Sequence, residues 1–114
     1  MRTCSTETQA FVSHTVDIPP CCPVSGNPVA GSTVTISYRP TGIVLPVEDL
    51  ADMVAEYVGG RGAIRGMEEM IQEICTRARD TVKVPVRVVA RLRIKPPFGG
   101  DLQWMRVTVR AAGI

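Results

Sequence analysis

Hydrophobic residues alternate with polar residues along four stretches of the chain. Residues 84–95 and 102–111 alternate most regularly, residues 31–40 follow the same period, and residues 10–18 alternate imperfectly. A period of two predicts half-buried strands with one apolar face and one polar face. The residues expected on the apolar faces of the three clearer strands are Val34, Ile36, Tyr38, Val84, Val86, Val88, Ala90, Leu92, Ile94, Met105, Val107 and Val109.

Between the second and third predicted strands the spacing of hydrophobic residues becomes helical. Pro46 begins a first amphipathic segment, and glycines 59, 60 and 62 end it. Residues 67–80 form a second, with Glu68 and Glu69 at its start, where the helix dipole favours acids. The expected apolar faces consist of Val47, Leu50, Val54 and Tyr57 in the first helix, and Met67, Met70, Ile71, Ile74, Cys75 and Ala78 in the second.

The element order ββααββ predicts an α+β fold, in which two helices cover one face of an antiparallel sheet. We expect one domain over residues 10–114, preceded by a flexible N-terminus at residues 1–9. Long unprotected sheet edges are unfavourable in a monomer, because they can pair with other chains. This favours a homo-oligomeric ring in which edges join between subunits, and a monomeric mass by light scattering would contradict that hypothesis.

Composition narrows the class of protein. A formal net charge of +2 does not by itself indicate nucleic-acid binding, and 45% hydrophobic residues allow a packed core. No run of 18 apolar residues is present, so no membrane partner is expected. The first eleven residues lack the apolar stretch of a secretory signal, which favours a cytoplasmic, reducing location.

The four cysteines form no zinc-binding pattern, because there is no CxxC pair and His14 is the single histidine. No metal site is therefore expected. Cys75 falls on the apolar face of the second helix and Cys4 in the N-terminus, so neither is a candidate site residue. The sequence PPCCPVSGNP at residues 19–28 is different, since it places two adjacent thiols in a turn rich in proline. Cys21 and Cys22 are either structural, metal-binding or nucleophilic.

Basic residues line the polar face of the third predicted strand. Arg87, Arg91 and Arg93 alternate there with apolar residues, and Arg106 and Arg110 occupy the polar face of the fourth strand. These side chains could contact the phosphates of RNA or DNA, and a solvated face or a subunit rim would explain them equally well. A salt-dependent affinity for nucleic acid distinguishes the two.

Several motifs together resemble the QueF family. These are the turn CPVSGNP at residues 22–28, the strand TISYRP at 35–40, an acid opening the second helix, and the Gly-Gly turn KPPFGGD at 95–101. The resemblance covers roughly residues 10–110. It implies the tunnelling fold, assembly as a ring, and action on the nitrile of 7-cyano-7-deazaguanine. One branch of the family reduces the nitrile with NADPH. A shorter branch, the QueF-like archaeosine synthases, forms an amidine on the same base in tRNA.

The resemblance also implies roles for two residues. Cys22 directly precedes the proline and so corresponds to the family nucleophile, which adds to the nitrile carbon and gives a thioimide. Glu68 corresponds to the acid that binds the guanine-like edge of the base, a geometry in which a carboxylate accepts two hydrogen bonds. The histidine that often precedes this acid is Met67 here, and Cys21 has no counterpart.

Two departures from the family pattern bear on the reaction. The family has an aspartate seven residues after the nucleophile for proton transfer, where this chain has Val29. Glu48, Asp49, Glu69 or an acid of a neighbouring subunit would have to replace it. Residues 42–53 lack the lysines that bind NADPH in the reductases, and the glycines of residues 59–66 do not follow a strand, as a dinucleotide fingerprint requires.

These departures favour an amidine-forming enzyme without a cofactor, acting on the base either free or within tRNA or DNA. The first alternative is reduction of the nitrile by NADPH to the aminomethyl base. The second is a non-catalytic binder of a modified base or of nucleic acid.

Overall fold

The computed structural model describes residues 10–22, 25–62, 66–96 and 99–113. The N-terminus predicted to be flexible and Cys4 lie outside these ranges. The elements follow the predicted order ββααββ. Their bounds are β1 Val12–Asp17, β2 Val29–Tyr38, α1 Val47–Ala55, α2 Met67–Val82, β3 Val86–Ile94 and β4 Gln103–Ala111.

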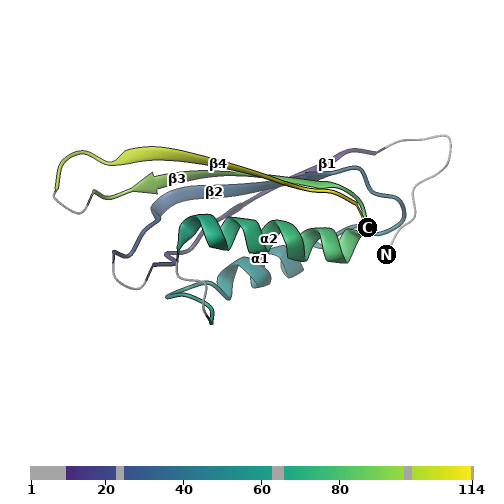
Figure 1. Cartoon of the computed structure of the whole chain (residues 1–114), viewed down its shortest axis with the longest axis horizontal. Helices are drawn as coiled ribbons and strands as arrows, with labels where there is room; N and C mark the ends of the chain where they lie inside the picture. Colours follow the sequence, from purple (N-terminus) through teal and green to yellow (C-terminus); the bar gives the residue numbers. More distant parts are fainter. Residues whose placement is uncertain (1–9, 23–24, 63–65, 97–98, 114) are drawn as a thin grey trace.

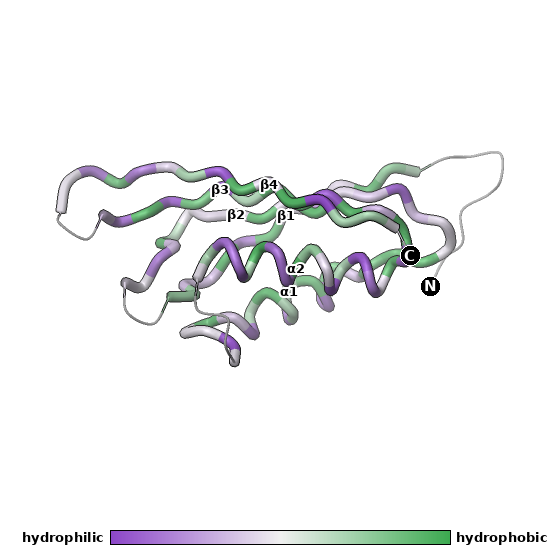
Figure 2. Tube along the Cα trace, viewed as in Figure 1, coloured by the Kyte–Doolittle hydropathy of each residue, from purple (hydrophilic) through white to green (hydrophobic). Residues whose placement is uncertain are grey.

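The four strands form one antiparallel sheet in the order β1-β2-β3-β4, so each strand pairs with its neighbour in the chain. Both helices lie on the same side of this sheet and leave the other side open (Figure 1). The hydropathy alternates along the strands while the helices carry apolar stripes (Figure 2). The predicted α+β class is therefore confirmed, with a covered face and an open face.

The core lies between the sheet and α2. Val34, Ile36, Val88 and Ala90 of the two central strands have no exposed surface. Opposite them, α2 buries five of the six residues that its spacing predicted, Met70, Ile71, Ile74, Cys75 and Ala78, and leaves the sixth, Met67, partly buried. Cys75 thus belongs to the core, as expected, and its thiol is directed at the carbonyl oxygen of Val86 at 3.7 Å. Burial raises the pKa of this thiol, so it stays protonated near neutral pH.

The first helix begins after Pro46, as predicted, but it is shorter than predicted and one residue of its predicted apolar face is exposed, while Tyr57 is buried as expected. It ends at Ala55, before Tyr57 and before the glycines. Val47 was expected on the apolar face and is 50% exposed, because side chains of a helix point back toward its N-terminus. At the first residue this direction leads away from the core. Met53 takes part in the buried face instead, with Leu50 and Val54.

A network of charged side chains connects the two helices beyond the end of α1. The Tyr57 hydroxyl donates a hydrogen bond to Glu73 at 2.6 Å. Arg61 pairs with Glu73 and Glu56, and Arg77 pairs with Glu56 at 3.0 Å. The hydrogen bond from Arg77 is the main reason that the pKa of Glu56 lies below its ordinary value. This network fixes how the chain returns to begin α2.

The burial of Ile74 and the exposure of Val47 predict different losses of stability when each side chain is truncated. Ile74→Ala removes a fully buried side chain, and we expect it to lower the free energy of unfolding by about 2–5 kcal/mol. Val47→Ala removes a half-exposed side chain and is expected to change it by less than about 0.5 kcal/mol. Urea unfolding followed by circular dichroism measures both. Equal losses for the two variants would contradict the assignment of the core.

Candidate functional site

The turn between β1 and β2 lies at the same end of the molecule as the N-terminus of α2 (Figure 1). Cys21 and Cys22 both donate their backbone N–H groups to the carbonyl oxygen of Asn27, each at 3.0 Å. The N–H of Gly26 returns to the carbonyl oxygen of Cys22 at 2.9 Å. These bonds close the turn on itself and set the backbone of both cysteines.

The side chain of Asn27 attaches this turn to the sheet. Its amide nitrogen donates to the carbonyl oxygen of Lys95 at 3.0 Å, and its amide oxygen accepts the N–H of Lys95 at 2.8 Å. Asn27 is only 5% exposed. It thus replaces a pair of sheet hydrogen bonds just beyond the end of β3. Asn27 was not among the predicted site residues, although an asparagine between Gly26 and Pro28 is typical of a tight turn.

The two adjacent cysteines have different surroundings. Cys21 has no exposed surface, and its sulfur lies 4.0 Å from the carbonyl oxygen of Gly66, the residue that precedes α2. Burial raises the pKa of the Cys21 thiol, and the nearby Cys22 and Glu69 add to the shift. Cys22 is partly exposed, and its sulfur accepts the backbone N–H of Ser25 at 3.5 Å. Because this N–H points at the sulfur, it stabilises negative charge there. The geometry therefore distinguishes a buried, protonated thiol from an accessible one.

The acids predicted for the site lie in the first turns of two different helices. Glu68 and Glu69 lie in the first turn of α2, and both are exposed. A Cβ atom added at Gly66 would lie 3.2 Å from Glu69 Oε1 and 3.7 Å from Glu68 Oε2. Both carboxylates therefore fold back over Gly66, the residue that also contacts Cys21. The structure thus brings Cys21, Glu68 and Glu69 together around Gly66, and Cys22 follows Cys21 in the adjoining turn.

Glu48 and Asp49 do not join this cluster within one chain. They lie in the first turn of α1, whereas the cysteine turn contacts the far end of that helix, where the N–H of Gly59 donates to the carbonyl oxygen of Pro20 at 3.1 Å. Nine helical residues, roughly 13 Å, separate the two ends. Of the acids proposed to replace the missing aspartate, the structure brings only Glu69 to the turn.

Val29 and His14 are strand residues. Val29 begins β2, where its carbonyl oxygen accepts the hydroxyl of Ser32 at 2.8 Å. His14 lies on the edge strand β1, opposite Ile36 of β2. Among the residues that the structure describes, no group of three or more His, Cys, Asp or Glu side chains could hold a metal ion. None of the helices in that part of the chain is long and apolar enough to cross a membrane.

The element order, the covered sheet and the turn at the N-terminus of α2 are those expected of a tunnelling fold. No protein-family model matches the chain, and no curated protein matches it. Among solved structures it is similar to the crystal structure of the archaeosine synthase QueF-Like in the apo form. The TM-score is 0.69 at 22% sequence identity, over 91% of this chain and 95% of that chain. This similarity confirms the fold that the resemblance to the QueF family predicts.

The different burial of Cys21 and Cys22 predicts the order in which the two thiols react. We expect iodoacetamide to alkylate Cys22 before Cys21, because Cys21 is buried and its pKa is raised. A raised pKa means that the folded chain retains the Cys21 proton to higher pH, so its labelling should increase only above the range of an ordinary thiol. Peptide mapping by mass spectrometry across a pH series measures each site. Earlier labelling of Cys21 would contradict the assignment.

The role of Asn27 is tested by two substitutions. Asn27→Ala leaves the N–H and carbonyl groups of Lys95 without their partners, and we expect a loss of about 1–3 kcal/mol for each group that stays buried. Asn27→Asp keeps the acceptor for the Lys95 N–H, but it buries a charge and turns an acceptor oxygen toward the Lys95 carbonyl oxygen, so its loss should be at least as large. Urea unfolding gives both values. If Asn27→Ala is as stable as the native chain, the turn is held in another way.

Proposed function

We propose that this protein is an enzyme of 7-deazaguanine chemistry in which Cys22 attacks the nitrile of 7-cyano-7-deazaguanine and an amidine is formed. The observation that carries the proposal is the division between the adjacent thiols, one buried against Gly66 and one accessible with a backbone N–H directed at its sulfur. The tunnelling fold and the motif CPVSGNP support it.

The chemistry follows from a thiolate placed next to an electrophilic carbon. Cys22 sulfur forms a bond to the nitrile carbon, and the nitrile nitrogen takes up a proton, which gives a thioimide. Ammonia, or a donor that supplies it, then adds to the same carbon. The Cys22 thiolate leaves as the amidine forms. No electrons are gained or lost, so this route needs no nicotinamide.

Glu68 and Glu69 have separate roles in this scheme. A carboxylate at Glu68 accepts hydrogen bonds from the ring N–H and the exocyclic amine of a guanine-like edge. Glu69 lies beside Gly66 and helps to raise the pKa of the Cys21 thiol, so it is our candidate for moving the proton that an aspartate would carry at position 29. Loss of a positioned acid typically lowers the rate by ~10²–10⁴, so slow turnover is compatible with the proposal.

The surroundings of α1 favour amidine formation over reduction. A cavity of about 400 Å³ between α1 and α2 is lined by Asp49, Asp52, Glu56 and Asp80, with Arg77 as the single base. Asp49 and Asp52 of this cavity lie within residues 42–53, where the resemblance to the QueF family places the lysines of the reductases. An acidic cavity repels the phosphates of NADPH.

The proposal predicts a covalent adduct that depends on one thiol. Incubation with 7-cyano-7-deazaguanine should raise the intact mass of the native chain and of Cys21→Ala by the mass of the base, and leave Cys22→Ala unchanged. Ammonia should then release an amidine product, whereas NADPH should have no effect. Binding without an adduct in any variant would replace the enzyme with a non-catalytic binder. Release by NADPH would indicate the reductase instead.

A binding measurement tests the role of Glu68 with a matched control. Glu68→Gln should weaken binding of the base by about tenfold or more, since hydrogen bonds to a charged group contribute about 1.5–3 kcal/mol. Glu48→Gln removes the same charge from the first turn of the other helix and should leave binding unchanged. Isothermal titration with the Cys22→Ala background separates binding from adduct formation. Equal affinities for the two variants would remove Glu68 from the site.

A further inference from the structure

The open face of the sheet concentrates positive charge without the acids that would neutralise it. Five arginines of β3 and β4 lie on this face, namely Arg87, Arg91, Arg93, Arg106 and Arg110. All but the partly buried Arg93 are exposed. Asp17 is the one carboxylate that the described strands contain, and it lies on β1 at the edge of the sheet. In the described ranges none of the five guanidinium groups forms an ion pair.

The register of the strands places like charges directly opposite one another. Arg87 pairs with Arg110, and Arg91 pairs with Arg106. Like charges at opposite positions of an antiparallel pair destabilise a sheet. If these positions served only solubility, we would expect acidic and basic side chains to lie opposite one another. Two such pairs on one face therefore indicate a polyanionic partner, whose binding would relieve the repulsion.

An exposed aromatic ring lies within the basic face. Trp104 is 59% exposed, and the guanidinium groups of Arg91 and Arg93 lie 5.1 and 5.6 Å from its ring centre. Arg93 is held there by the bulge in β2, since its N–H donates to the Ser32 hydroxyl at 2.8 Å. Gly31, with a φ of +96°, leaves room that a Cβ would fill at 2.9 Å from Arg93 Cδ. The indole ring is thus flanked by two guanidinium groups and open to solvent.

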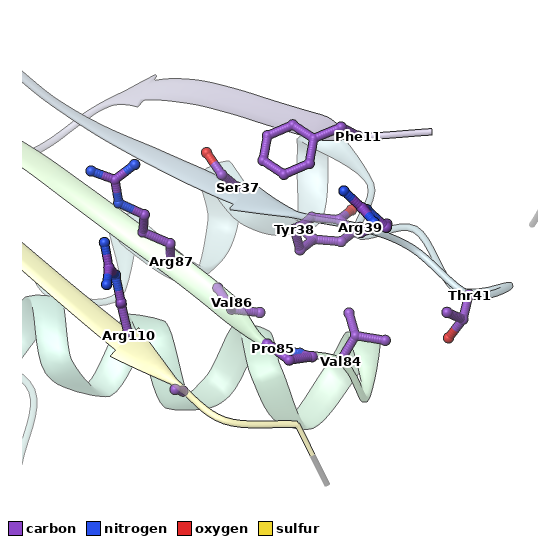
Figure 3. A pocket seen from close by; sticks show the side chains of 11 residues that line it. Phe11, Ser37, Tyr38, Arg39, Thr41, Val84, Pro85, Val86, Arg87 and Arg110 are labelled. Atoms are coloured by element: carbon purple, nitrogen blue, oxygen red, sulfur yellow. The ribbon is translucent and has the colours of Figure 1, made fainter. Parts of the chain in front are cut away.

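At the opposite end of the same strands an apolar groove of about 510 Å³ opens. Its lining includes Phe11 and Pro85, and Arg87 and Arg110 extend from adjacent strands beside it (Figure 3). Phe11 is 66% exposed. From Arg87 to Arg93 the strand advances roughly 20 Å. The arginines therefore lie between two places where a flat apolar group can stack.

We propose that this open face binds single-stranded nucleic acid, with the arginines on the phosphates and Trp104 stacked against a base. Arginine tracks combined with exposed aromatic rings are how proteins bind single strands of any sequence, because every base has a π-face. The surface goes beyond the proposed chemistry at Cys22 and does not depend on it. It names the class of macromolecule in which a base could be presented to this protein.

The single tryptophan of the chain makes the proposal directly measurable. Titration of the native protein with the unmodified oligonucleotides (dT)12 and (U)12 should quench the fluorescence of Trp104 as the anisotropy of a labelled oligonucleotide rises. Five phosphate contacts predict that log K falls with log salt at a slope of about −3.5. Trp104→Ala should weaken binding by about tenfold or more.

Charge-matched variants distinguish this face from general attraction. Arg91→Gln/Arg106→Gln should reduce the salt slope to about −2.1 and raise the thermal midpoint, since it removes a like-charge pair. Arg79→Gln/Lys83→Gln removes the same charge from the end of α2 and should leave both the slope and the quenching unchanged. Because Cys22→Ala should bind as the native chain does, a failed nitrile reaction leaves this result intact.

Three results would overturn the proposal. The first is binding without a change in Trp104 fluorescence. The second is equal quenching by inorganic polyphosphate, which lacks bases. The third is protection of Trp104 from acrylamide in the protein alone, which would show that a second copy of the chain covers the face.

Discussion

The buried amide of Asn27 is the interaction on which the candidate site depends. The backbone carbonyl oxygen of Asn27 accepts the N–H groups of Cys21 and Cys22, while the side-chain amide of the same residue binds both backbone groups of Lys95. One residue thus fixes the shape of the turn and joins the turn to the sheet. Backbone polar groups at the end of a strand must find partners somewhere, and here they find them in the segment that carries the thiols.

Because the turn is held in this way, two chemically identical side chains have different properties. Cys21 packs against Gly66 and fills the space between the turn and α2, and burial keeps it protonated. Cys22 is partly exposed, and its sulfur accepts the backbone N–H of Ser25. The buried thiol is thus part of what positions the accessible one. In this proline-rich turn Cys21 has a structural role, and Cys22 is the thiol that we propose reacts.

The two faces of the sheet are used differently. The covered face contacts the helices and contains the apolar residues of the alternating pattern. The open face contains hydroxyl groups near β1 and arginines near β4, and its charge is left without acids. Since core packing places no demand on that face, its composition reflects what it meets in solution or in an assembly.

Much of the fold was predictable from the spacing of hydrophobic residues alone. Period two over residues 84–95 and the helical spacing of residues 67–80 placed the buried side chains correctly, because a core needs an apolar stripe on each element that faces it. The position of Val47 was not predictable in this way, since the spacing does not reveal where neighbouring elements end. The clamp at Asn27 and the cross-strand pairs of arginines depend on contacts between residues far apart in sequence.

The candidate site was predictable in part. The motif at residues 22–28 and the acid at Glu68 were readable from the chain, and the fold brings them to one end of the molecule. Local sequence could not reveal that Glu69, rather than Glu48 or Asp49, lies at the turn. That distinction requires the direction in which α1 and α2 run across the sheet.

A crystal structure of the protein soaked with 7-cyano-7-deazaguanine tests the central claim most directly. We expect continuous electron density between Cys22 sulfur and the former nitrile carbon, with the Glu68 carboxylate facing the guanine-like edge of the base. A base bound elsewhere, or bound at the turn with Cys22 sulfur pointing away from the nitrile, would contradict it.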